Sequence, residues 1–184
     1  GAQNTAMGQS ALRLNTTGDY QVALGANALA ANTTGSNNIA IGYNALTANT
    51  TADNNTAVGY QSLLSNTTGT QNTSVGAYSL DANTTGGQNT AIGEASLGAN
   101  TTASNNTAVG YHALKVNTTG TQNVAVGNYA LDASNSDDNT AVGYQALTAA
   151  TTAANNTAIG HNAMAATTTG GECTALGANA LLAH

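Results

Sequence analysis

The sequence lacks Phe, Trp and Pro, has a single Cys, and carries only two basic and eight acidic residues among its 184. Without large aromatic side chains an ordinary globular core is excluded, because those residues bury the most apolar surface. The lone Cys173 argues against a disulfide framework and a catalytic thiol. The two basic residues, Arg13 and Lys115, are too few to neutralise nucleic-acid phosphates. No apolar run has the length of a membrane-spanning helix, and no signal peptide is visible.

What the chain does contain is a repeat, which is the signature of a solenoid. One glycine recurs every 17 residues, except for a single 16-residue step from Gly127 to Gly143. The consensus N-T-A-V-G-Y-x-A-L-x-x-N-T-T-G is too short for a helical repeat, and its Asn, Thr and Gly are typical of a β coil with tight turns. We therefore predict an all-β fold: a parallel β-solenoid of eleven coils, forming one domain over residues 1–184. Counting from the recurrent glycine as position 0, the glycines are Gly8, Gly25, Gly42, Gly59, Gly76, Gly93, Gly110, Gly127, Gly143, Gly160 and Gly177.

Two aliphatic columns are the candidates for the interior. Position −1 is always aliphatic, as in Val58, and position +4 is Leu or Met, as in Leu63. Position −1 alternates with Ala at −2 and Thr or an aliphatic residue at −3, which is the period of a strand. We expect both aliphatic columns to point inward, with a bend near the glycine and a second turn at N-T-T-G. A charge placed at Val58 or Leu63 would then enter the core and unfold neighbouring coils.

Small and amide residues form further columns. Gly at 0, Ala at −2 and Ala or Ser at +3 make smooth stripes, which we expect to pack against another chain, since a core of one Val and one Leu per coil is thin. The alternative is that these small residues point inward in a very narrow coil. Asn recurs at −4 in nine units and at +7 in seven, which predicts side-chain amide ladders at the turns.

The motif N-T-A-V-G, seen at residues 55–59 and 106–110, resembles the head repeats of YadA-like trimeric autotransporter adhesins. The longer unit G-Y-x-A-L-x-x-N-T-T-G is similar to repeats in phage tail-fibre-type proteins. The resemblance covers all eleven units. It implies a left-handed β-roll assembled as a homotrimer, a fragment of a larger fibrous or surface protein, and an extracellular location on a bacterial surface or a virion fibre. This sequence has mostly Thr where the head repeats have Val, and its units are longer than most of theirs.

No residue pattern indicates an enzyme, a cofactor site or a metal site. His112, His161 and His184 lie at variable positions or at the chain end, without metal-ligand spacing. The acidic residues form no recurring pair suited to acid–base catalysis. One cluster, Asp132, Asp137 and Asp138, falls in the 16-residue unit, where either a solvated loop or a calcium site is conceivable. We expect the loop.

Two functions remain open. The first is a structural or adhesive module that touches a host-surface protein or glycan through tyrosines at the variable positions. The candidate contacts are Tyr43, Tyr60, Tyr111 and Tyr144 at +1, with Tyr78 and Tyr129 at +2. Stacking between coils is the other explanation for these tyrosines. The second function is ice binding through Thr at +8 and +9, such as Thr33 and Thr34. Against it stands geometry, since adjacent residues of a strand point to opposite sides.

Overall fold

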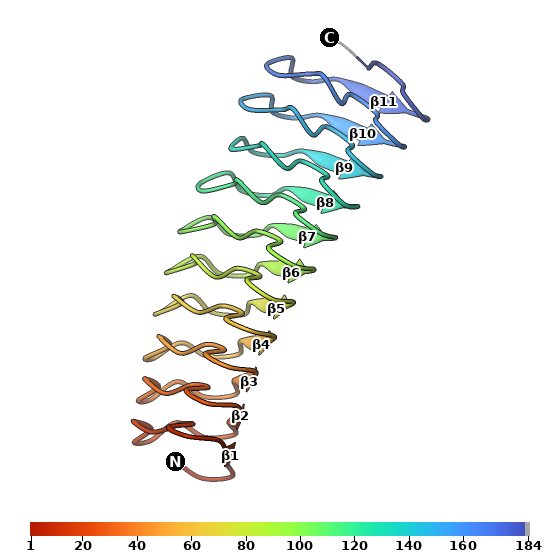
Figure 1. Cartoon of the computed structure of the whole chain (residues 1–184). Helices are drawn as coiled ribbons and strands as arrows, with labels where there is room; N and C mark the ends of the chain where they lie inside the picture. Colours follow the sequence, from red (N-terminus) through yellow and green to blue (C-terminus); the bar gives the residue numbers. More distant parts are fainter. Residues whose placement is uncertain (183–184) are drawn as a thin grey trace.

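Each repeat forms one coil of a parallel β-solenoid, and the coils stack in sequence order along a rod (Figure 1). The computed structural model describes residues 1–182, so the expectation that His184 is no metal ligand lies outside the described residues. Every coil contributes one three-residue strand, and we number the coils by their strands. The strands are β1 (Thr5–Met7), β2 (Val22–Leu24), β3 (Ile39–Ile41), β4 (Thr56–Val58), β5 (Thr73–Val75), β6 (Thr90–Ile92), β7 (Thr107–Val109), β8 (Val124–Val126), β9 (Thr140–Val142), β10 (Thr157–Ile159) and β11 (Thr174–Leu176).

The eleven strands make one parallel sheet in which each strand pairs with its neighbours in sequence. The register places identical repeat positions side by side, so Thr56 pairs with Thr73 and Val58 with Val75. This pairing holds across the 16-residue step as well, where Val124 pairs with Thr140. The β-solenoid predicted from the repeat is confirmed. Residues at the same repeat position lie next to one another in neighbouring coils.

The strands face the opposite way from our expectation. Ala at −2 points inward and is fully buried from Ala23 to Ala158, whereas positions −3 and −1 point outward. Val58 is therefore half-buried on the outer face of the sheet, and Ile41 is 37% exposed. The prediction that the −1 column lies inside was wrong, and so was the prediction that the Ala stripes form an outer contact surface. The alternative, a coil so narrow that small residues fill it, is what the structure shows.

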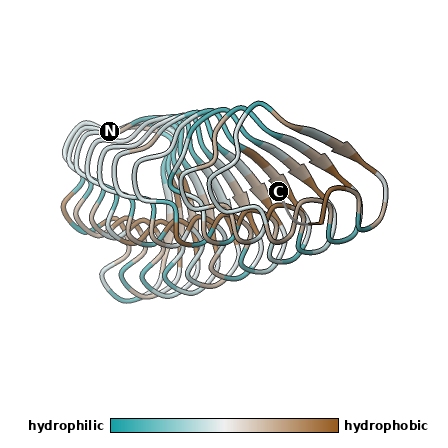
Figure 2. Cartoon of the chain, turned by 90° about the horizontal axis from the view of Figure 1, so that it is seen from above, coloured by the Kyte–Doolittle hydropathy of each residue, from teal (hydrophilic) through white to brown (hydrophobic). Residues whose placement is uncertain are grey.

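The leucines explain why alanine faces them. Leu63 and its equivalents at +4 are fully buried, as predicted, in coils 2–10. Figure 2 shows a row of hydrophobic segments running along the stacked coils. The Ala or Ser at +3 is buried in the same layer, as in Ala45 and Ser62. Because Leu already occupies the space between the two sides of the coil, a strand residue opposite it has room for only a methyl group. Val or Ile at that position would overpack the interior.

One serine in the alanine column shows how tightly the interior is specified. Ser74 replaces Ala at −2 in β5 and is fully buried. Its hydroxyl pairs with the hydroxyl of Ser62 at 2.7 Å and with that of Ser79 at 2.8 Å, and both partners lie at +3. A buried hydroxyl without such partners would be costly. The Ser residues at +3 therefore satisfy the one polar interruption of the strand column.

Amide ladders run along two edges of the coil, as predicted. At −4, Asn72 Nδ2 donates to the carbonyl of Gly86 at 2.9 Å, and its Oδ1 accepts the backbone N–H of Asn89 at 3.0 Å. At +7, Asn66 Nδ2 donates to Asn49 Oδ1 at 3.2 Å and to the carbonyl of Gly69 at 2.9 Å. These side chains bridge turns whose backbone groups would otherwise be buried without partners.

The bend predicted at the glycine has an unusual backbone. The position-0 glycines have φ between 122° and 138°, and the Leu or Met at +4 has φ between 47° and 53° in every coil. A Cβ added to Gly59 would lie 2.5 Å from the carbonyl oxygen of Gly76. Glycine is required there by both conformation and close approach of the next coil. A left-handed leucine costs about 1 kcal/mol or more, and its complete burial offsets that cost.

Candidate functional site

An aromatic row follows the corner after the glycine, on the side chains at +1 and +2. In its first part Tyr43 stacks on Tyr60 with ring centroids 5.5 Å apart, and Tyr60 meets Tyr78 edge-to-face at 5.2 Å. In its second part Tyr111 meets Tyr129 at 5.3 Å, and Tyr129 meets Tyr144 at 6.2 Å. The structure thus brings the four tyrosines predicted as contacts at +1 into two groups, Tyr43 with Tyr60 and Tyr111 with Tyr144 through Tyr129. Tyr43, Tyr60 and Tyr144 are exposed, and Tyr111 is half-buried.

Two histidines belong to the second part of the row, which the sequence did not suggest. His112 stacks on Tyr111 at 3.8 Å and meets Tyr129 edge-to-face, while His161 stacks on Tyr144 at 5.5 Å. His112 is half-buried rather than solvent-exposed. Burial and the nearby Lys115 ammonium lower the pKa of His112, opposed by Asp132 and Glu94. His112 therefore packs as part of the aromatic row, between Tyr111 and Tyr129.

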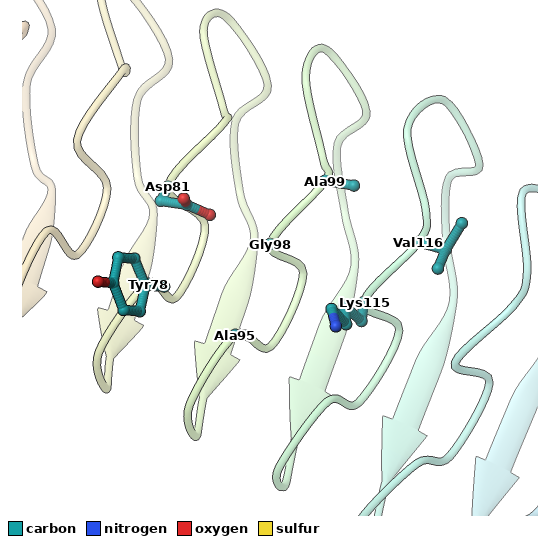
Figure 3. Close-up of a pocket in the computed structure, with 7 residues that line it drawn as sticks. All are labelled: Tyr78, Asp81, Ala95, Gly98, Ala99, Lys115 and Val116. Atoms are coloured by element: carbon teal, nitrogen blue, oxygen red, sulfur yellow. The ribbon is translucent and has the colours of Figure 1, made fainter.

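The row is interrupted at coil 6, where Glu94 and Ala95 stand at +1 and +2. The interruption leaves a hollow of about 360 Å³. Figure 3 shows the hollow spanning coils 5, 6 and 7, with the Asp81 carboxyl directed toward the coil of Gly98. Its lining residues are Tyr78, Asp81, Ala95, Gly98, Ala99, Lys115 and Val116.

A line of charges at +5 passes through this region. Asp81, Gly98, Lys115 and Asp132 occupy that position in coils 5 to 8, so a glycine separates the first carboxyl from the ammonium group. Burial raises the pKa of Asp81, partly offset by hydrogen bonds from the backbone N–H groups of Asp81 and Ala82. Burial also raises the pKa of Asp132, opposed by the positive charge of His112 and Lys115.

A neutral side chain at Asp132 should stabilise the protein near pH 7. The pKa of Asp132 is higher in the folded than in the unfolded chain, so the folded state binds the proton more tightly and stability falls as the pH rises through this interval. Asp132 Oδ1 is also buried without a hydrogen-bond partner. We expect Asp132→Asn to raise the melting temperature at pH 7 by at most a few degrees, with no gain at pH 3, where the carboxyl is protonated in both states. Thermal melts followed by circular dichroism at the two pH values measure this, and an equal gain at both would contradict it.

The acidic cluster of the 16-residue unit is dispersed in the folded chain. Asp137 Oδ1 accepts a hydrogen bond from the backbone N–H of Thr121 at 2.6 Å, so this carboxyl satisfies a backbone donor of the neighbouring turn. Asp132 lies instead at +5 beside His112 and Lys115. Within residues 1–182 no three His, Cys, Asp or Glu side chains lie close enough together to hold a metal ion. Cys173 occupies the −4 column, where its backbone N–H donates to Asn156 Oδ1 and its Sγ contacts the carbonyl of Gly171.

No protein-family model, curated protein or solved structure matches this chain. The described residues also form no helix long and apolar enough to cross a membrane.

The outer face of the sheet is a second candidate surface. It carries position −3, which is Thr in eight of the eleven strands, and position −1, which is always aliphatic. None of the ten charged residues occupies either position. Val126 is 36% exposed, Ile159 39% and Ile92 40%. Two uncharged rows, one mostly threonine and one aliphatic, thus run the length of the rod.

Proposed function

We propose that this chain is a structural and adhesive surface module, a rigid β-roll that assembles as a homotrimer through the outer face of its sheet. The observation that carries the proposal is the aliphatic row at −1, whose side chains from Met7 to Leu176 are exposed or half-buried in a single chain. Exposed apolar surface this continuous is typical of a protein interface. The absence of charged residues from the same face also indicates an interface, because interface centres are depleted of charged residues.

A cyclic assembly would bring these rows together around one axis and bury them. The number three follows the resemblance of N-T-A-V-G to the trimeric adhesin head repeats. The carboxylates that give the chain its net charge of −6 would then lie outside the interface. The aromatic row and the hollow in coil 6 lie on coil segments beyond the strand, and they supply the variable side chains that a host-surface protein or glycan would contact.

Assembly is tested by light scattering on the purified chain. We expect a particle of about three times the 18.0 kDa chain mass. Val58→Asp should dissociate it while leaving the far-ultraviolet circular dichroism unchanged, because three carboxylates would meet at one level of the axis. Val116→Asp is the matched control, since Val116 is 46% exposed at +6, off the sheet. A wild-type monomer at tens of micromolar would rule out the trimer.

Ice binding is a second candidate function. The adjacent Thr residues at +8 and +9 would point to opposite sides of a strand, but the outer face of the sheet has residues that point the same way. Thr at −3 and the aliphatic residue at −1 are i and i+2 on one strand, so both point outward in a regular array. The Thr residues at +8 form hydrogen bonds between coils instead, as where Thr33 Oγ1 donates to the carbonyl of Thr50 at 2.9 Å. Trimer formation and ice binding use the same face and exclude each other. A monomer that shows thermal hysteresis would favour ice binding.

A further inference from the structure

The hollow in coil 6 results from two departures from the repeat in one unit. Ala95 stands at +2, where other coils carry Tyr, His, Asn, Gln or Ser, and Gly98 at +5 separates Asp81 from Lys115. A Cβ at residue 98 would lie 3.4 Å from Asp81 Oδ1, so the glycine keeps the space beside that carboxyl open. The space is about 360 Å³, near the lower end of the ~300–1,000 Å³ that small-ligand pockets occupy.

The walls of the hollow differ in chemistry. Tyr78 on coil 5 is 42% exposed and supplies an aromatic ring at one side. Ala95, Gly98 and Ala99 line it with small apolar groups. The lining is mainly apolar, and its two charged residues are Asp81 on coil 5 and Lys115 on coil 7, on opposite sides of the gap (Figure 3). An aromatic surface combined with a few polar groups of both kinds suits a ligand with one apolar face and hydroxyls around its edge.

We infer that this hollow binds one neutral pyranose residue of a glycan, with the sugar ring against Tyr78 and its hydroxyls donating to Asp81 and accepting from Lys115. The inference rests on the proposed adhesive function and names the class of receptor. An acidic sugar fits less well, because its carboxylate would meet Asp81 in the hollow and a chain whose net charge is −6. One acidic and one basic residue, Asp81 and Lys115, line the hollow, so their charges balance when the ligand is neutral.

Saturation-transfer NMR with neutral oligosaccharides containing glucose, galactose, mannose or N-acetylglucosamine tests the inference. We expect at least one of them to receive saturation at millimolar concentration, and sialylated or uronate-containing oligosaccharides to receive none. Ala95→Tyr should abolish the signal by filling the hollow. It should also fold, since Ala95 has the same left-handed backbone (φ 52°) as Tyr78 and Tyr129 at the equivalent position. Gln145→Tyr, at that position in coil 9, is the matched control and should bind like the wild type.

The contribution of the carboxyl is measured separately. Asp81→Asn should weaken binding about tenfold, because it removes a charged acceptor from the sugar hydroxyls. Asp132→Asn, at the same repeat position three coils away, should leave binding unchanged. No binding of any neutral oligosaccharide, binding of acidic ones alone, or equal binding by the Ala95→Tyr variant would each overturn the pyranose site.

Attachment of the fluorescent chain to intact cells separates this inference from the proposed function. If the wild type and Ala95→Tyr attach equally, the adhesive function stands and the pyranose site is overturned. If the wild type binds a neutral oligosaccharide in solution but attaches to no cell surface, the site stands and the adhesive function fails. Light scattering should give the same oligomeric state for both chains, because residue 95 lies outside the outer face of the sheet.

Discussion

Replacing Leu63 by Asp should unfold the coils around it. Leu63 is fully buried between the equivalent Leu46 and Leu80. An unpaired carboxylate there would lose its water with no basic partner in the column, at a cost of several kcal/mol. Asp accepts the left-handed conformation of this position more readily than Leu does, so desolvation rather than backbone strain is the cause. In a solenoid each coil is stabilised by its neighbours, and the damage should extend to coils 3 and 5.

Circular dichroism melts would measure the loss, and we expect the midpoint to fall by about 10 °C or more for a chain of this length. Leu63→Met is the matched control. Met164 occupies the same column in coil 10, fully buried, so the thioether side chain is compatible with the interior. That variant should lose less than about 1.5 kcal/mol. An unchanged midpoint for Leu63→Asp would mean that the leucine column is not the core.

Replacing Gly59 by Ala should be the second most damaging single change. The glycine has φ of 138°, a conformation that other residues rarely adopt, and the added methyl group would lie 2.5 Å from the Gly76 carbonyl oxygen. Backbone strain and displacement of the next coil together should cost about 3 kcal/mol or more. The stacking of coils 4 and 5 would have to open to relieve the contact.

Gly98→Ala is the matched control for this substitution. Gly98 does not have the left-handed backbone, and the closest atom to its added Cβ would be the Ala95 carbonyl oxygen at 3.2 Å. We expect its denaturant midpoint to change little, whereas that of Gly59→Ala falls clearly. Equal midpoints for the two variants would show that the position-0 glycine is dispensable.

The sequence predicts the repeat, the coil and the amide ladders because each depends on identity at a fixed period. It does not predict which side of the strand is inside. Alternation shows that Ala57 and Val58 face opposite ways without giving the direction, and hydrophobicity alone favours Val inside. The width of the coil decides, and that width is set by Leu63, which lies on the other side of the bend. For the same reason Val58→Asp belongs to a test of assembly and not to a test of the core.

The candidate site was predicted in part. The repeat places the tyrosines at one corner, so their grouping follows from spacing. The hollow depends on two small residues of one coil, Ala95 and Gly98, and its other walls come from the neighbouring coils, which only the stacking of the coils places beside them. A comparison of the eleven units position by position does contain the signal, since coil 6 alone has Ala at +2 together with Gly at +5.

The 16-residue unit shows how such a chain can change its length. There the Ser136 carbonyl accepts from Asn123 Nδ2 at 2.8 Å, as the Gly120 carbonyl does from Asn106 one coil earlier, so the missing residue is absorbed in the turn between +7 and the next strand. The strand register is unaffected. Gaining or losing a whole unit would alter the reach of the rod by about 4.8 Å and leave its sides unchanged. The number of units therefore sets the length of the molecule without changing its lateral surfaces.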